Sequence, residues 1–312
     1  MGGKASERLE ADAHGIARAA ELLRAGQLVA VPTETVYGLA ARADSEAAVA
    51  AIFRAKGRPD FNPLIVHVAS LAMARELAEF DERAEALAAR YWPGPLTLVL
   101  PSRASAVVAA VTAGLPTIAL RMPDHAAMRR LLETLALPLA APSANRSGAI
   151  SPTAAEHVAA TLGGEVAAIV DGGPCPRGVE STIVALRTDG SWQLLRPGPT
   201  GADDLAELIG PPTELTDAGI EAPGQLARHY SPGKPLRLDA REAAADEFMI
   251  GFGPLGGDCS LSEEGDLALA AARLYACLHL AAASDKPRIA VAPVPEEGIG
   301  AAINDRLRRA AA

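Results

Sequence analysis

The apolar residues of this chain change their spacing along its length, and that change limits the possible folds more than any other feature. Residues 6 to 25 carry apolar side chains at helical spacing and end at Gly26. Residues 28 to 31 then form a short continuous apolar run, as in a buried strand. The alternation continues through most of the chain. Helices alternating with strands pack as layers on a sheet, so the sequence predicts an α/β protein.

Further strands are predicted where apolar runs are short, and further helices where apolar residues recur on one face. The strands are expected at residues 64–68, 96–100, 117–120, 139–141, 168–170, 181–186 and 193–195. The helices are expected at residues 45–56, 71–79, 82–91, 125–136, 153–161 and 203–209. Several strands, notably the last two, follow one another without a helix between them, which predicts a twisted mixed sheet.

Proline and glycine accumulate between residues 211 and 235, where the apolar periodicity lapses. That composition predicts a linker. Beyond it, strand, helix, strand and helix are expected at residues 247–251, 263–282, 288–292 and 300–310. We therefore expect a larger α/β domain over residues 1–210, a linker over 211–235 and a smaller α/β domain over 236–312.

Composition excludes several classes of protein. No apolar run approaches the roughly 18 residues that a membrane span needs, and the N-terminus lacks a basic segment followed by an apolar one. We therefore expect a cytoplasmic protein. The net charge of -9 argues against indiscriminate nucleic-acid binding, so an anionic ligand must meet a local group of cations. Cys175, Cys259 and Cys277 lack metal-ligand spacing, so no metal site is predicted.

Polar residues gather at the ends of the predicted strands, the usual place for a site in an open α/β sheet. Arg121 lies one residue beyond an apolar run, where an unpaired cation would cost several kcal/mol. His67, inside an apolar strand, is open to two interpretations, a core histidine or a ligand-binding one. The five polar segments are residues 32–38, 56–67, 117–121, 141–145 with Ser151, and 177–182 with 196–198.

Common nucleotide-binding and hydrolase motifs do not identify the function of this chain. No G-x-x-x-x-G-K-[ST], G-x-S-x-G or H-E-x-x-H is present. Residues 251–256 match G-x-G-x-x-G after a strand, but Pro254 lies inside the turn and the next helix is expected several residues later. We interpret this segment as a glycine-rich turn.

Six segments together resemble the YrdC-like threonylcarbamoyl-adenylate synthases, in their longer two-domain form. They are PTETVYGL, KGRP-x-x-NPL, WPGPLT, TIALRMP, APSAN-x-SG, and GVESTI followed by LLRPG. RHYSPGKP and GIGAAINDRLRRAA fit the second half of that form. The resemblance implies a twisted mixed sheet followed by a smaller Rossmann-like domain.

The resemblance also implies a reaction in which L-threonine, bicarbonate and ATP give threonylcarbamoyl-AMP and pyrophosphate. The product is the precursor of N6-threonylcarbamoyladenosine in certain tRNAs. Mg²⁺ is expected on the phosphates, and downstream threonylcarbamoyl-transfer proteins are the expected partners, with a possible weak contact to tRNA. No side-chain nucleophile is required, so the protein orients the substrates and stabilises charge.

The resemblance assigns roles to residues by motif position. The expected catalytic residues are Lys56, Arg58, Ser143 and Asn145. The expected ATP-binding residues are Arg58, Asn62, Thr117, Ser143, Ser151, Arg196 and Tyr230, with Lys56 also near the phosphates. The expected threonine-binding residues are Thr35, His67, Arg121, Ala141 and Ser181.

The linker departs from the family pattern. Leu226 stands where a lysine is expected, while Arg228, His229 and Tyr230 are kept. Because loops of this length are usually functional or disordered, we expect Tyr230 to close over the nucleotide as part of a lid.

Two other functions stay open on the sequence. A carbamoyl-transfer domain of hydrogenase maturation factors shares the YrdC-like core but needs partner modules with paired cysteines. A double-stranded RNA-binding or translation-regulating module would use the same concave face, although the net charge disfavours it.

Overall fold

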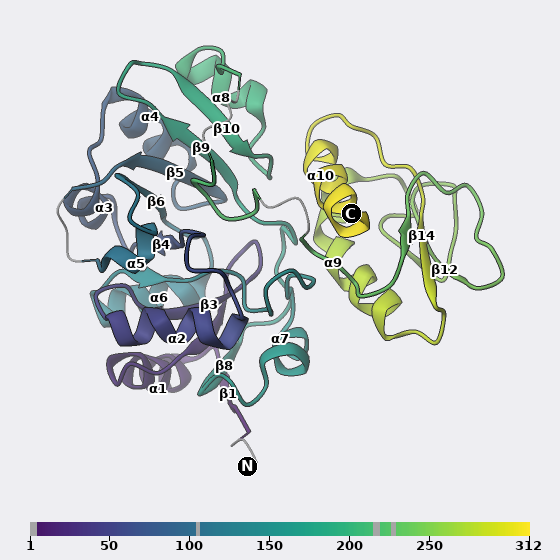
Figure 1. Ribbon diagram of the computed structural model, residues 1–312, viewed down its shortest axis with the longest axis horizontal. Helices are drawn as coiled ribbons and strands as arrows, with labels where there is room; N and C mark the ends of the chain where they lie inside the picture. The colour runs from purple at the N-terminus through teal and green to yellow at the C-terminus, as the bar shows by residue number, and fades with distance from the viewer. Residues whose placement is uncertain (1–4, 104–106, 215–218, 226–228) are drawn as a thin grey trace.

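The computed structural model describes residues 5–103, 107–214, 219–225 and 229–312. These residues form a large and a small α/β unit, which lie side by side in Figure 1. The large unit holds a ten-stranded sheet and the small one a four-stranded sheet. The predicted α/β class is therefore confirmed.

The large sheet is mixed, with strand order β1-β8-β2-β3-β7-β4-β6-β5-β9-β10. Its central strands β4 and β6 run parallel, whereas β7 runs antiparallel to β4. The strands are β1 (Glu7–Glu10), β2 (Val29–Pro32), β3 (Tyr37–Arg42), β4 (Ile65–His67), β5 (Leu96–Pro101), β6 (Thr117–Arg121), β7 (Leu139–Ala140), β8 (Ala168–Asp171), β9 (Thr182–Leu186) and β10 (Trp192–Arg196).

Eight helices accompany this sheet among the described residues. They are α1 (Ala13–Arg24), α2 (Glu46–Lys56), α3 (Leu71–Leu77), α4 (Glu82–Tyr91), α5 (Ala109–Thr112), α6 (Ala126–Leu135), α7 (Ala155–Leu162) and α8 (Ala202–Ile209).

Two sequence predictions were wrong near the N-terminus. Residues 7 to 10 form β1 instead of the first turn of a helix, because they pair in parallel with β8. The helix α1 begins only after Asp12, whose side chain accepts a hydrogen bond from the Gly15 N–H at 2.8 Å. The second error is an omission, because β3 pairs antiparallel with β2 although no strand was predicted at residues 37–42.

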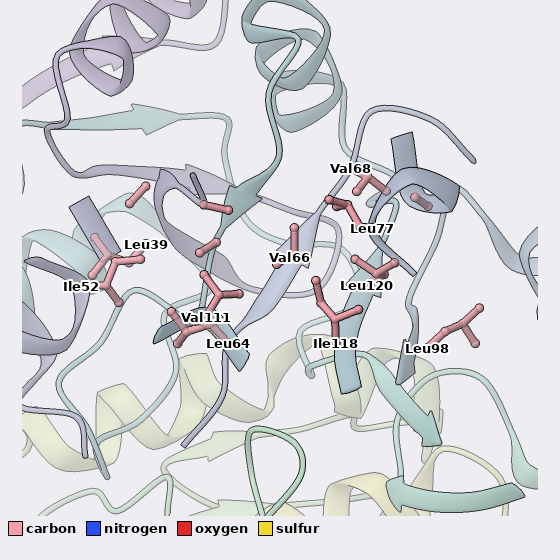
Figure 2. Packing of buried hydrophobic residues seen from close by; sticks show 14 of the residues in the cluster. Leu39, Ile52, Leu64, Val66, Val68, Leu77, Leu98, Val111, Ile118 and Leu120 are labelled. Atoms are coloured by element: carbon pink, nitrogen blue, oxygen red, sulfur yellow. The ribbon is translucent and has the colours of Figure 1, made fainter. Parts of the chain in front are cut away.

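The strands bury alternate residues on opposite faces of the large sheet. Figure 2 shows part of one face, where Leu39, Val66, Leu98 and Leu120 belong to a buried cluster that also contains Ile52 of α2 and Leu77 of α3. On the other face, α1 and α6 cover the β2 end of the sheet. Further along that face the linker residue Ala222 packs on Ile65 and Ala119.

The small unit has an all-parallel sheet of order β11-β14-β12-β13. Its helices lie on the side that faces the large unit (Figure 1). The elements are β11 (Leu236–Arg237), β12 (Glu247–Gly251), β13 (Cys259–Ser260), α9 (Leu267–Ala283), β14 (Arg288–Val291) and α10 (Gly300–Ala311). The G-x-G-x-x-G segment forms a tight turn after β12, with the Phe252 N–H donating to the Leu255 carbonyl at 3.0 Å. It does not open a helix, so its interpretation as a turn is confirmed.

Candidate active site

Two neighbouring strands place His67 and Arg121 next to each other. β4 and β6 pair in parallel with His67 opposite Arg121. Because side chains alternate along a strand, both point away from the face that holds Val66 and Leu120. They therefore lie on the face that the linker covers.

Eighteen residues line a pocket on that face. Nine of them are predicted site residues, namely Thr35, Arg58, His67, Arg121, Ala141, Ser143, Ser181, Arg196 and Tyr230. The others are Thr33, Val36, Gly38, Ile65, Pro142, Glu180, Pro223, Gly224 and His229. The sheet and the linker thus gather segments from six separate parts of the chain.

The Arg121 end of the pocket holds a closed ion pair. The guanidinium donates to Glu34 Oε1 at 2.5 Å, to Thr35 Oγ1 at 2.9 Å and to the Gly94 carbonyl at 3.1 Å. Both members of the Arg121–Glu34 pair are buried. Arg121 therefore already has a counter-charge, and this end of the pocket is close to neutral.

His67 is held in its neutral form. Burial, and then the positive charge of Arg121, lowers the pKa of its imidazole to about 3. Its Nδ1 is buried and has no hydrogen-bond partner among the described residues. An unpaired polar atom that faces a pocket is available to a ligand, which favours the ligand-binding interpretation over a satisfied core histidine.

The 141–145 segment is fixed by its neighbours. The Ala141 N–H donates to the Ile65 carbonyl at 3.1 Å, and Gly38 forms a bridge with Ser143. Lys56 Nζ donates to the carbonyls of Ser143 and Asn145, each at 2.5 Å. Lys56 therefore holds this segment from behind, and its amine is not among the pocket-lining groups.

Arg58 lies at the start of the loop after α2. Gly57 adopts a left-handed conformation, with φ 60°, that ends the helix and turns the chain toward the pocket. Arg58 donates through Nη2 to Asn62 Oδ1 at 2.6 Å and to the Pro63 carbonyl at 2.9 Å. Asn62 thus orients Arg58 without itself lining the pocket.

Arg196 ends β10 and is tied to β9 and the linker. Its Nε donates to the Ser181 carbonyl at 3.0 Å, and its Nη2 donates to Ser181 Oγ at 3.1 Å. The Pro223 carbonyl accepts from Nη1 at 3.3 Å. Thr97 shares a further hydrogen bond with Ser181 across 2.7 Å.

Lys56, Arg58 and Arg196 are buried cations that form no salt bridge with a carboxylate among the described residues. In the described part of the chain, their hydrogen bonds go to backbone carbonyls, an amide and a hydroxyl. Burial, and then the charge of Arg196, lowers the pKa of Arg58 to about 10. Burial likewise lowers the pKa of Lys56 and that of Arg196 below their ordinary values. Such a group of cations is typical of a binding site for a polyanion.

The linker closes this pocket. Pro223, Gly224, His229 and Tyr230 all line it, and Tyr230 is fully buried. The space left for solvent inside is about 40 Å³, enough for water but far below the volume of ordinary ligand pockets. Leu226 and Arg228, which the sequence analysis singled out, lie outside the described residues.

Five predicted residues do not line the pocket: Lys56, Asn62, Thr117, Asn145 and Ser151. Lys56 contacts the lining residue Ser143, and Asn62 contacts the lining residue Arg58. Asn145 is linked to the lining only through Lys56. Ser151 donates to Glu180 Oε1 at 2.6 Å, so it lies one contact behind the lining. Thr117 lies at the far end of β6 from Arg121 and lines a different pocket, beside Pro101 and Leu186.

Sequence reasoning missed two carboxylates, Glu34 and Glu180. Both stand inside polar motifs that were noticed, PTETVYGL and GVESTI, but their partners lie far away in the sequence. Glu34 pairs with Arg121 and Glu180 pairs with Arg306. The sequence signal that could have identified them was a glutamate inside each of these two predicted ligand-binding segments.

Neither a metal cluster nor a membrane-spanning helix is present in the part of the chain that the structure describes. No group of three or more His, Cys, Asp or Glu side chains there could hold a metal ion. No helix there is long and apolar enough to cross a membrane.

Comparison with known protein families gives two matches that together span most of the chain. Residues 21–198 match a family model, Sua5_yciO_yrdC, described as Telomere recombination. Residues 201–312 match a model described as Threonylcarbamoyl-AMP synthase, C-terminal domain.

Individual relatives agree with these models. The chain is 41% identical over 321 residues to a threonylcarbamoyl-AMP synthase of Bacillus subtilis, covering 95% of this chain and 92% of that protein. It is 41% identical over 316 residues to a protein of the same name from Pyrococcus abyssi, covering 94% and 92%. A crystal structure of P. abyssi Sua5 complexed with L-threonine superposes with a TM-score of 0.89 at 38% identity, covering 99% of this chain and 98% of that one.

Proposed function

The chain belongs to the two-domain Sua5 family of threonylcarbamoyl-AMP synthases, and from this we propose that its pocket makes threonylcarbamoyl-AMP and pyrophosphate from L-threonine, bicarbonate and ATP. An adenylyl group moves to a carbamate oxygen, so the enzyme is a nucleotidyltransferase. The observation that carries this proposal is the group of three buried cations that form no salt bridge among the described residues, because ATP would bring negative charge to them.

The triphosphate lies at the Arg58 and Arg196 end of the pocket. Their guanidinium groups contact phosphate oxygens, and Ser143 supplies a hydroxyl from the adjoining segment. Lys56 acts mainly by holding the backbone of the segment that carries Ser143, because it donates to the carbonyls of Ser143 and Asn145. Asn62 orients Arg58, and Ser151 orients the same region through Glu180.

Threonine lies at the Arg121 end. Arg121 retains N–H groups beyond its three bonded ones, and these meet the threonine carboxylate. Thr35 and Ser181 supply hydroxyls, and the backbone at Ala141 borders the amino acid. Neutral His67 offers its unpaired Nδ1 for a hydrogen bond.

The reaction then needs only orientation and charge stabilisation. The threonine amine, after losing a proton, attacks the bicarbonate carbon, and water leaves to give a carbamate. A carbamate oxygen attacks the α-phosphorus of ATP, and the bond to the β-phosphate oxygen breaks. Arg58 and Arg196 stabilise the charge that develops on the departing pyrophosphate, and no side chain forms a covalent bond.

Mg²⁺ enters with ATP as part of the substrate. The described residues offer no carboxylate cluster for it, and Glu180 already accepts three hydrogen bonds and pairs with Arg306. This donor set fits a cation held by phosphate oxygens and water, which is how Mg²⁺ usually binds in such sites.

Residues 211–235 act as a lid. Four linker residues line a pocket that is too small for a nucleotide as it stands, so the linker must move for ATP to enter. Closure afterwards excludes water and protects the labile adenylate from hydrolysis. Tyr230 also adopts a left-handed backbone with φ 65°, a strained conformation for a residue other than glycine.

The product serves tRNA modification. The enzyme works in the cytoplasm and passes its adenylate to threonylcarbamoyl-transfer proteins, with tRNA contact weak at most because the net charge is -9.

The decisive assay measures pyrophosphate release by the purified chain with ATP and Mg²⁺. Release should require both L-threonine and bicarbonate, and mass spectrometry should detect threonylcarbamoyl-AMP. Reactions without threonine or without bicarbonate are the controls. Release that is independent of either substrate, or ATP binding without release, would overturn the proposal and favour a binding module.

A further inference from the structure

We propose that Arg306, in the C-terminal domain, is a positioning residue of the active site that holds Glu180 and Tyr230 in place for ATP. The inference rests on the proposed function. It gives the second domain a role in the reaction, because Arg306 lies on α10 and Glu180 lies in the large unit.

Arg306 is fully buried where the two units meet. Its Nε donates to Glu180 Oε2 at 3.0 Å, and its Nη1 donates to Asp305 Oδ2 at 2.7 Å. A guanidinium in such a place is costly unless it is paired, and an apolar side chain would fill the same space more cheaply. Packing between domains therefore does not explain why an arginine stands there.

Glu180 connects Arg306 to the candidate ATP site. Its carboxylate also accepts hydrogen bonds from Ser151 Oγ at 2.6 Å and from Tyr275 OH at 2.8 Å. Burial alone would raise the pKa of Glu180, but the charges of Arg306 and Arg196 and these hydrogen bonds lower it to about 2. Glu180 is therefore an anion that α9 and α10 hold next to Ser181, the residue to which Arg196 donates.

Tyr230 is the second point of contact. The guanidinium carbon of Arg306 lies 5.5 Å from the centre of the Tyr230 ring, within the range of a cation–π interaction. The Tyr275 ring lies 5.5 Å from the same ring, and the neighbouring His229 N–H donates to the Arg309 carbonyl of α10 at 3.3 Å. The C-terminal domain thus holds the linker in its closed position.

The Tyr230 hydroxyl indicates why the C-terminal domain holds this ring in place. It is buried and has no partner among the described residues. A Cβ atom on Gly224 would meet both the Tyr230 hydroxyl and Arg196 Nη1 at 3.3 Å, so these two groups border the same point. A hydroxyl donor left unpaired beside the Arg196 guanidinium suits a phosphate oxygen, and Arg306 fixes the ring that carries it.

The test compares Arg306→Met and Arg306→Lys with Arg308→Met. Arg308 lies on the same helix but is exposed and pairs with Glu296 at the surface, so it is a matched control. The measurements are KM for ATP and for threonine, kcat from pyrophosphate release, ATP affinity by calorimetry, and thermal unfolding. Arg306→Met should weaken ATP affinity and raise the ATP KM about tenfold or more, while the threonine KM changes less than about twofold.

Arg306→Lys should recover part of the loss, because it keeps the charge toward Glu180 but lacks the planar face toward Tyr230. A purely structural role predicts lower thermal stability with both KM values unchanged in the folded fraction. That result, or equal changes in both KM values, would overturn the proposal.

Arg306→Met leaves the Glu180 charge unpaired and could fail to fold for that reason. The double variant Glu180→Gln with Arg306→Met removes both charges and should fold, and its ATP affinity should still fall about tenfold. Unchanged ATP affinity in the double variant would refute the positioning role.

If wild type and Arg308→Met both fail to release pyrophosphate, the proposed function fails. The calorimetric comparison of ATP affinity then still decides whether Arg306 positions the nucleotide site.

Discussion

Replacing Arg58 by methionine should separate substrate binding from stability. Arg58 is buried, and its hydrogen bonds go to neutral groups, Asn62 and the Pro63 carbonyl. Its pKa of about 10, against an ordinary 12.5, corresponds to a destabilisation of about 3 kcal/mol. The lost hydrogen bonds are worth about 1 kcal/mol each, so the two contributions offset each other. Arg58→Met should therefore change the free energy of unfolding by less than about 2 kcal/mol.

The effect on ATP should be much larger. One charge-assisted hydrogen bond to phosphate is worth about 1.5 to 3 kcal/mol, so ATP affinity should fall at least about tenfold. Calorimetric titration with ATP, pyrophosphate release and chemical denaturation measure the three quantities. Arg54→Met is the matched control, because Arg54 lies shortly before Arg58 in the sequence, on α2, and is exposed. A folded Arg58→Met enzyme with unchanged ATP affinity and turnover would refute the assignment.

Three further predictions address other parts of the site. Arg121→Leu should raise the threonine KM far more than the ATP KM in steady-state kinetics, and equal effects would remove Arg121 from the threonine site. Tyr230→Ala should reduce turnover at least about tenfold. ATP with threonine should protect the wild-type linker from trypsin at the Arg228–His229 bond, and an active variant with an unprotected linker would leave residues 211–235 as a tether. The pKa of buried His67 is about 3, below its ordinary 6.5, because the folded protein disfavours the protonated imidazole. The free energy of unfolding should therefore fall as pH decreases from 6.5 toward 3. His67→Gln should lose less stability over this range in denaturation curves measured at each pH.

Much of the fold could be predicted from local pattern, because short apolar runs and amphipathic segments coincide with most strands and helices. The exceptions have physical causes. β3 begins at Tyr37 and Gly38, inside a motif whose polar residues resemble a loop, and its pairing with β2 decides its structure. β1 is a strand because β8, more than 150 residues away, pairs with it.

The candidate site could be predicted only as a set of segments. Strand ends with polar residues pointed to Arg58, His67 and Arg121, but the spacing of residues along the chain could not show which charges are paired. Glu34 lies 87 residues from Arg121, and Glu180 lies 126 residues from Arg306. Strand register determines the surroundings of the Glu34–Arg121 pair, and packing between the two domains brings Glu180 and Arg306 together. Neither effect can be recognised from the residues next to these positions in the sequence.

The division of charge along the pocket matches the charges of the two substrates. Threonine is a zwitterion with no net charge, and the end of the pocket assigned to it has a guanidinium already balanced by Glu34. ATP is a polyanion, and the end assigned to it has Lys56, Arg58 and Arg196, which form no salt bridge among the described residues and each have a lowered pKa. The nearby Glu180 carboxylate pairs with Arg306, so positive charge is in excess at this end. Binding ATP at the Arg121 end would leave those three cations uncompensated and bring the triphosphate close to the Glu34 carboxylate. The opposite placement neutralises the cations and leaves the Arg121–Glu34 pair intact, so electrostatics alone orders the substrates along the pocket.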